Sequence, residues 1–257
     1  MAIPDTLAAR LIETVFNHGL SGHLAMLGRQ EWIGVRRGAS AQLLEDTLAK
    51  YLPGVREKDL ANPDDSYSET FFQTLGFTTI DSIDYSGQEG ASLLHDLSQP
   101  MPETFKAQFD VIYDGGTCEH IFDVPTAFAN IDFALKPGGV LIGHSPCNNW
   151  INHGFFQFCP ELVYSYWEAT RGYEILDLRL QPLRPATANK TATTTDPKET
   201  GRRPFVLGDL PNAPTIMHYV VRKPLQPAPV KPTHQMGYLR KWDGEGTPPP
   251  TQRNASG

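Results

Sequence analysis

The sequence predicts an α/β fold in a single domain, with a mostly parallel sheet flanked by helices. Two observations predict it. Short apolar runs that end at glycine or at polar residues alternate with longer segments of helical periodicity, which is the pattern of successive βαβ units. The chain also has 257 residues, 40% of them hydrophobic and 20% charged, which is enough to bury one large core.

The expected strands are runs of apolar and β-branched residues with the length of buried strands. They span residues 23–27, 77–83, 109–113, 140–143, 173–180 and 215–222, with a shorter segment at 93–97. The expected helices have apolar residues at helical spacing, a proline in the first turn or a glycine after the last. They span residues 4–18, 41–52, 68–75, 124–135 and 160–171.

The domain is expected to cover residues 1–222. Within it we expect a mostly helical insertion at about residues 31–66, and a loop or lid at 181–214, where Thr, Pro and Arg are frequent and periodicity is absent. Residues 223–257 are rich in Pro and Gly, so they are expected to form a weakly ordered tail.

Composition argues against several classes of partner. The net charge of −7 disfavours a nucleic-acid partner, because such partners are held by Lys and Arg. No apolar run is long enough to cross a bilayer and no signal peptide is recognisable, so a cytoplasmic protein without a membrane partner is expected. Three cysteines without metal-ligand spacing predict neither disulfides nor a metal site.

Ligands of parallel sheets bind beyond the carboxyl ends of the strands, so the loops that follow the predicted strands are the places to examine. Four segments there occur in a recognisable order, and the third of them is followed by Glu119-His120-Ile121. They are Asp81-Ser82-Ile83-Asp84-Tyr85, His95-Asp96-Leu97, Phe109-Asp110-Val111-Ile112-Tyr113 and Ala134-Leu135-Lys136-Pro137-Gly138-Gly139. With these segments the chain resembles the class I S-adenosylmethionine-dependent methyltransferases over about residues 20–222, most closely the small bacterial enzymes that methylate metabolites.

The resemblance implies a Rossmann-like, seven-stranded, mostly parallel sheet and S-adenosylmethionine as cofactor. It implies that Asp84, with Asp81 as second choice, accepts hydrogen bonds from the ribose hydroxyls, and that Asp96 and the Leu97 amide contact adenine. The complete set of cofactor-binding residues expected is Gly28, Arg29, Gln30, Asp84, Tyr85, Asp96, Leu97, Asp114, Gly115, Gly116 and Thr117. An Asp at a strand end also commonly caps a turn, which is the alternative for each carboxylate.

The first strand-end loop departs from the family pattern. The family has a Gly-x-Gly-x-Gly run there, whereas this chain has Gly28-Arg29-Gln30-Glu31. We expect Arg29 or Gln30 to contact the cofactor carboxylate instead. Gly28 also lies much farther from Asp84 than the roughly 20 residues of an ordinary dinucleotide-binding unit, so the insertion between them is expected to cover the active site.

Candidate general bases are His153, ranked first, then His120 and His144. His153 belongs to a polar and aromatic segment, residues 148–158, where the acceptor is expected to bind; the alternative is a histidine that orders its loop. The acceptor-binding residues expected in this segment are Asn149, Asn152, Phe155 and Phe156.

The sequence therefore predicts an enzyme that methylates a small molecule. Two rival functions stay open. The glycine-poor first loop is compatible with a non-catalytic binding or scaffold protein of the same fold, and a protein or RNA methyltransferase is the other rival.

Overall fold

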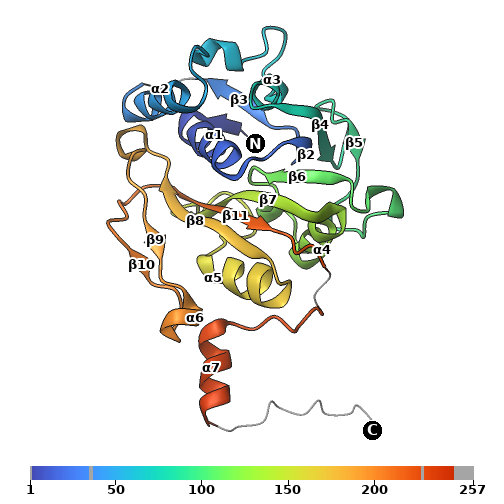
Figure 1. Ribbon diagram of the computed structural model, residues 1–257, viewed down its shortest axis with the longest axis vertical. Helices are drawn as coiled ribbons and strands as arrows, with labels where there is room; N and C mark the ends of the chain where they lie inside the picture. The colour runs from blue at the N-terminus through green and yellow to red at the C-terminus, as the bar shows by residue number, and fades with distance from the viewer. Residues whose placement is uncertain (1, 35–36, 227–228, 246–257) are drawn as a thin grey trace.

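Seven strands form one sheet in the order β5-β4-β2-β6-β7-β11-β8 (Figure 1). The computed structural model describes residues 2–34, 37–226 and 229–245. The strands are β2 (Gly22–Leu27), β4 (Phe77–Asp84), β5 (Leu93–Leu94), β6 (Phe109–Asp114), β7 (Leu135–Asn148), β8 (Glu174–Pro182) and β11 (Thr215–Arg222). β5, β4, β2, β6 and β7 pair in parallel, whereas β11 is antiparallel to β7 and β8. The predicted Rossmann-like, mostly parallel sheet is confirmed.

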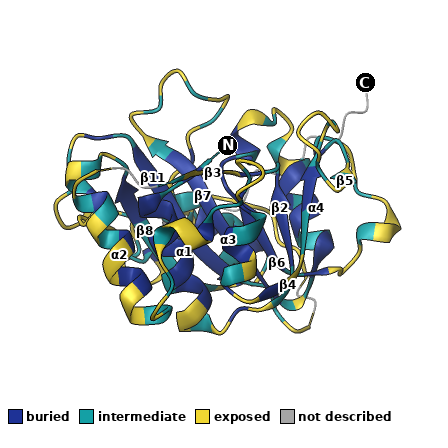
Figure 2. Cartoon of the chain, turned by 90° about the horizontal axis from the view of Figure 1, so that it is seen from above, coloured by how far each residue is buried: buried dark blue, intermediate teal, exposed yellow. Residues whose placement is uncertain are grey.

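Helices cover both faces of the sheet (Figures 1 and 2). The α-helices are α1 (Asp5–His18), α2 (Ala39–Tyr51), α3 (Glu69–Thr74), α4 (Val124–Ala134), α5 (Pro160–Leu162), α6 (Pro197–Thr200) and α7 (Met236–Glu245). The described residues also form short helices of other types: η1 (Glu57–Leu60), η2 (Glu103–Phe105), η3 (Cys118–His120), the π-helix η4 (Val163–Thr170) and η5 (Pro185–Thr187).

Each face of the sheet packs its own core, because successive side chains of a strand point to opposite faces. In β2, Leu24 and Met26 pack with the helices α1, α2 and α3. Ala25 and Leu27 of the same strand pack with α4 and the π-helix. Figure 2 shows the buried strands between helices whose outer surfaces are exposed. The carboxyl ends of the strands are thereby held in fixed register.

The chain reverses its direction of progress across the sheet at β2. It runs from β2 to β4 and β5 on one side, then returns to β6 and β7 on the other. Leu27 at the end of β2 pairs with Asp114 at the end of β6. This is a topological switch point, at which open α/β sheets bind their ligands.

The predicted insertion contains a strand as well as helices. β3 (Glu31–Gly34) pairs in parallel with β1 (Ala2–Pro4), and the two form a separate small sheet. The sequence predicted neither strand, because three or four residues show no periodicity and their pairing depends on distant parts of the chain. The insertion thus joins the amino-terminal segment to the body of the domain.

The segments after β7 are more structured than the sequence predicted. The predicted loop at 181–214 contains η5, the hairpin of β9 (Thr193–Thr194) and β10 (Val206–Leu207), and α6. In the predicted tail, Met236–Glu245 forms α7, while 246–257 lie outside the described residues. Within the part of the chain that the structure describes, no helix combines the length and the hydropathy needed to cross a bilayer.

A glycine in the middle of the sheet provides a test of this packing. Gly143 of β7 pairs with Tyr219 of β11, and a Cβ at Gly143 would overlap the ring of that completely buried tyrosine. Gly143→Ala is therefore expected to lower the free energy of unfolding by about 1–3 kcal/mol in urea denaturation. Gly87→Ala is the control, because its nearest neighbours would lie 3.9 Å away. Equal stability of the two variants would contradict the predicted packing.

Candidate functional site

The loops that follow β2, β4 and β6 meet at the switch point. Gly28, with a φ of +67°, lies where the three converge. A Cβ on Gly28 would be 3.2 Å from Thr117 Oγ1 and 3.7 Å from Asp84 Oδ2. Three of the residues expected at the cofactor site thus lie close together at this edge of the sheet.

The side chain of Gln30 forms hydrogen bonds within its own loop. Its side chain is completely buried, and its Nε2 donates to the carbonyl oxygens of Leu27 at 2.8 Å and Gly28 at 3.4 Å. Both N–H groups are used, so none is left for a cofactor carboxylate. Gly115 packs against this amide, and a Cβ there would overlap Gln30 Oε1.

Arg29 is held by residues at the end of the insertion. Its Nε donates to Glu69 at 2.7 Å, one terminal nitrogen donates to Asp65 at 3.2 Å, and the other donates to the carbonyl oxygen of Glu89 at 2.9 Å. The guanidinium carbon also lies 3.8 Å from the centre of the Tyr67 ring. The predicted role of Arg29 in binding a cofactor carboxylate would require these contacts to be exchanged.

The carboxylates after β4 and β5 have different surroundings. Asp84 Oδ1 accepts from the Ser86 amide at 3.3 Å, and its Oδ2 is the atom that approaches Gly28. Asp96 accepts from the Ser98 amide at 2.9 Å, and hydrogen bonds from Ser98 lower its pKa. Asp96 therefore caps its own turn, the alternative noted for strand-end carboxylates. Of their predicted neighbours, Tyr85 is exposed and Leu97 is buried.

Asp114 shapes the loop after β6. Its buried Oδ1 accepts from the amides of Gly116 at 3.2 Å and Thr117 at 2.8 Å. Burial raises the pKa of this carboxyl, and the hydrogen bonds from the backbone oppose that rise. Thr117 in turn donates its hydroxyl to the Leu27 carbonyl at 2.6 Å. The loop is thus joined to the end of β2.

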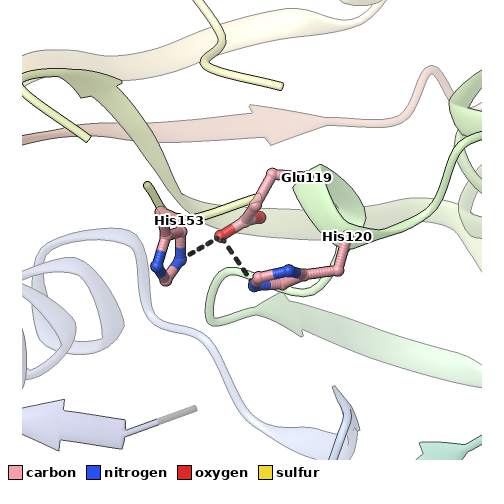
Figure 3. A group of neighbouring side chains, drawn as sticks. All are labelled: Glu119, His120 and His153. Atoms are coloured by element: carbon pink, nitrogen blue, oxygen red, sulfur yellow. Dashed lines mark hydrogen bonds and ion pairs between the residues drawn. The ribbon is translucent and has the colours of Figure 1, made fainter. Parts of the chain in front are cut away.

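A carboxylate and two histidines gather beside this loop (Figure 3). Glu119 is completely buried, and its Oε1 lies 3.2 Å from His153 Nε2 and 4.0 Å from His120 Nε2. Its Oε2 has no hydrogen-bond partner among the described residues. Burial, and then the nearby charge of Asp114, raise the pKa of Glu119 to about 8. The two histidines were predicted from the sequence as candidate bases, whereas the glutamate was assigned no role.

The segment after β7 is fastened to the backbone of Glu119. The amides of Phe155 and Phe156 donate to the Glu119 carbonyl oxygen at 2.9 and 3.2 Å. Gly154 allows this approach, because a Cβ there would lie 2.8 Å from the same oxygen. This contact places His153 beside the Glu119 carboxylate.

The predicted acceptor-binding residues of this segment are not gathered in one place. Asn149 donates to Asn212 at 3.0 Å and to the Ala213 carbonyl at 3.1 Å, so it anchors the segment. Asn152 and Phe155 are exposed. Phe155 stacks edge-on against the exposed ring of Phe122, with ring centres 5.6 Å apart.

A cavity of about 420 Å³ is lined by Glu119, His153, Trp150 and Gly115. Most of its other walls come from three parts of the chain. They are the amino-terminal residues Ala2, Pro4, Asp5, Thr6 and Leu7, then Ile33 and Ser40 of the insertion, and Leu183, Arg184 and Pro185 of the 181–214 segment. Two residues of the insertion thus line this cavity, and that the insertion covers the active site stays a prediction. The amino-terminal wall gave no signal in the sequence.

His144, the third candidate base, also lines this cavity. Its Nδ1 lies 2.9 Å from the Tyr113 hydroxyl and its Nε2 lies 2.8 Å from His218 Nδ1. Burial lowers the pKa of His144 well below its usual value. Because both ring nitrogens have buried partners, His144 belongs to the interior hydrogen-bond network.

No protein-family model and no curated protein matches this sequence. Among solved structures, the N-methyltransferase NodS from Bradyrhizobium japonicum WM9 is 13% identical, with a TM-score of 0.41 over 84% of this chain and 85% of that chain. The 1,6-didemethyltoxoflavin-N1-methyltransferase of Burkholderia thailandensis is 13% identical, with a TM-score of 0.43 over 86% and 80%. The YcgJ protein of Bacillus subtilis is 12% identical, with a TM-score of 0.40 over 84% and 97%. Any function proposed for this chain therefore has to rest on its own residues.

The contact between Gly154 and Glu119 can be tested by hydrogen exchange. Gly154→Ala is expected to push the segment away from the Glu119 carbonyl and to break the hydrogen bonds from Phe155 and Phe156. Protection of these two amides should fall about 2- to 13-fold, since each lost hydrogen bond is worth about 0.5–1.5 kcal/mol. Gly87→Ala should leave both amides protected. Unchanged protection in Gly154→Ala would show that the segment does not depend on this contact.

Proposed function

We propose that this chain transfers a methyl group from S-adenosylmethionine to a small-molecule acceptor. The observation that carries the proposal is the position of Gly115. It belongs to the loop that meets Gly28 and Asp84 at the switch point, and it also lines the cavity that Glu119 and His153 line. The proposed nucleoside site and the proposed acceptor cavity would therefore adjoin at a residue without a side chain.

The residues at the switch point fit the nucleoside part of this cofactor. Asp84 supplies a carboxylate oxygen beside Gly28, where it can accept hydrogen bonds from both ribose hydroxyls. Gly115 and Gly116 let the backbone approach the methionyl part closely. The cofactor, when bound, supplies a methyl group on a positively charged sulfur. Buried Asp114 and Glu119 belong to the end of β6 and the loop after it, and a cation bound there would favour their charged forms.

The cavity fits a small acceptor. Its volume of about 420 Å³ lies within the range of about 300–1,000 Å³ that is common for small-molecule sites. Ile33 and Trp150 supply apolar walls, and the polar groups of the lining include Glu119 and His153 as well as Asp5 and Arg184. Methyl transfer needs chiefly that the acceptor atom and the methyl carbon be aligned with water excluded. These walls perform that alignment.

In this proposal, Glu119 and His153 lie next to the reacting atom of the acceptor. An oxygen or nitrogen acceptor must lose a proton, and a positioned base accelerates such a step by about 10²- to 10⁴-fold. His153 was predicted for this role, with His120 second. The structure adds Glu119, whose carboxylate lies between the two rings and fixes the orientation of His153.

The second candidate function is a non-catalytic binding protein of the same fold. One observation favours it: the side-chain donors of Arg29 and Gln30 are already used within the protein.

The three cysteines, Cys118, Cys147 and Cys159, are unpaired, which agrees with a reducing compartment. We propose the cytoplasm for either function.

Calorimetry with S-adenosylhomocysteine separates the two functions. The wild-type chain should bind it, and Asp84→Asn should weaken binding about 10- to 100-fold, as expected for the loss of charge-assisted hydrogen bonds worth about 1.5–3 kcal/mol. Asp81→Asn is the matched control, because that carboxylate is bound to His23 at 2.7 Å and Ser92 at 2.7 Å. No heat at millimolar ligand would favour the non-catalytic protein.

The size of the acceptor can be tested with cell extract and a cofactor labelled in its methyl group. Label transferred by the wild-type chain should appear among small molecules, because the proposed acceptor site is a cavity of about 420 Å³, which suits a small molecule. Gly115→Ala should transfer little label, since its Cβ would displace the Gln30 side chain. Label retained in protein or RNA would overturn the proposed acceptor class.

A further inference from the structure

Glu119, His120 and His153 have the composition of a metal site. Two imidazoles and one carboxylate suit zinc and other divalent transition metals, whereas calcium and magnesium prefer oxygen ligands alone. The three residues come from two loops, the one after β6 and the one after β7. Because these loops are distant in the sequence, ligand spacing along the chain does not reveal the site.

The geometry of the three side chains suits one ion. One ligand atom from each residue lies within 4.8 Å of the other two, and Glu119 Oε1 is 3.2 Å and 4.0 Å from the two Nε2 atoms. Ligand atoms of a tetrahedral zinc are about 3.3 Å apart when the bonds are about 2.0–2.1 Å long. In Figure 3 both rings present a nitrogen to the Glu119 oxygen. Small side-chain rotations would complete the site.

Glu119 gives an independent reason to expect an ion. Its side chain is completely buried, yet Oε2 has no hydrogen-bond partner among the described residues. A buried carboxylate without a full set of partners is costly, and coordination of a metal is one of the ways in which proteins avoid that cost. A cation between Glu119 and the two rings would bind this carboxylate.

The surroundings would leave such an ion accessible on one side. The Glu119 backbone is fixed by the amides of Phe155 and Phe156, and His153 packs against Trp150 with ring centres 4.9 Å apart. Glu119 and His153 line the cavity, while the His120 side chain is 43% exposed. Three protein ligands and an open position toward a cavity are typical of catalytic rather than structural metal sites.

We propose that Glu119, His120 and His153 bind one divalent transition-metal ion, which holds an oxygen of the methyl acceptor. The part that concerns the acceptor rests on the proposed function. A hydroxyl bound to such an ion loses its proton to solvent more readily, so with the ion bound the two histidines act as ligands and neither has to act as the general base. The deprotonated oxygen then forms a bond to the methyl carbon, and the carbon–sulfur bond of the cofactor breaks with its electron pair left on sulfur. The substrate class is therefore a small molecule with a hydroxyl or enol oxygen.

The test uses the full chain without a histidine tag, after treatment with EDTA to remove bound metal. Binding of Zn²⁺ is measured by calorimetry, and binding of Co²⁺ is measured by visible absorption. One ion per chain is expected, with cobalt bands of a site that contains nitrogen ligands. Glu119→Gln and His120→Ala should each weaken binding by at least about 100-fold, because even outer partners of metal ligands are worth about 10- to 100-fold. His120 is half exposed, so its variant keeps the test valid if Glu119→Gln does not fold.

His18→Ala is the matched control. His18 ends α1 next to the amino ends of the strands, whereas the proposed ligands follow the carboxyl ends of β6 and β7. It should bind metal like the wild type. Stoichiometry far below one ion per chain, or equal affinity in His120→Ala and the wild type, would overturn the proposal. S-adenosylhomocysteine binding by the EDTA-treated wild type is measured in parallel. Cofactor binding without metal binding would overturn the metal site alone, and the reverse result would overturn the proposed function alone.

Discussion

The site depends on the contact between the segment after β7 and the backbone of Glu119. Two amides of that segment donate to one carbonyl oxygen, and Gly154 lets the chains approach closely enough for this to happen. The contact brings His153 to a carboxylate that lies on a different loop, and both residues line the cavity. Without it, these two residues would be separate.

The burial of Glu119 then sets the electrostatics of the site. A carboxylate removed from water must be protonated, paired with a cation or fully hydrogen-bonded. Its raised pKa, about 8, reflects the first of these possibilities in the absence of a cation. A bound metal ion or the positive sulfur of the cofactor would favour the charged form. The charge state of the Glu119 carboxylate would therefore depend on whether the proposed metal ion or the proposed cofactor is bound.

Much of the fold follows from the sequence because buried parallel strands are continuous apolar runs. The predicted strands at 23–27, 77–83, 109–113 and 215–222 agree with β2, β4, β6 and β11 to within one residue. β7 is longer than the predicted 140–143 at both ends, because residues 135–139 begin it despite their proline and glycines and residues 144–148 continue it. β1 and β3 were not predicted, since each exists only because the other lies beside it.

The candidate site was predictable where sheet geometry alone fixes it. Gly28, Asp84 and Thr117 meet because the carboxyl ends of neighbouring parallel strands share one edge. The partners of Arg29 were not predictable, because they depend on the path of the insertion. The orientation of Phe155 was not predictable either, since loop side chains follow no periodicity that distinguishes a cavity wall from the outer surface.

A crystal structure of the chain with S-adenosylhomocysteine would test most directly whether the strand ends form a cofactor site. The nucleoside should lie against Asp84 and Gly28, with the sulfur above Gly115 and directed toward the cavity at Glu119. A nucleoside bound elsewhere, or a sulfur directed away from that cavity, would contradict the methyltransferase assignment.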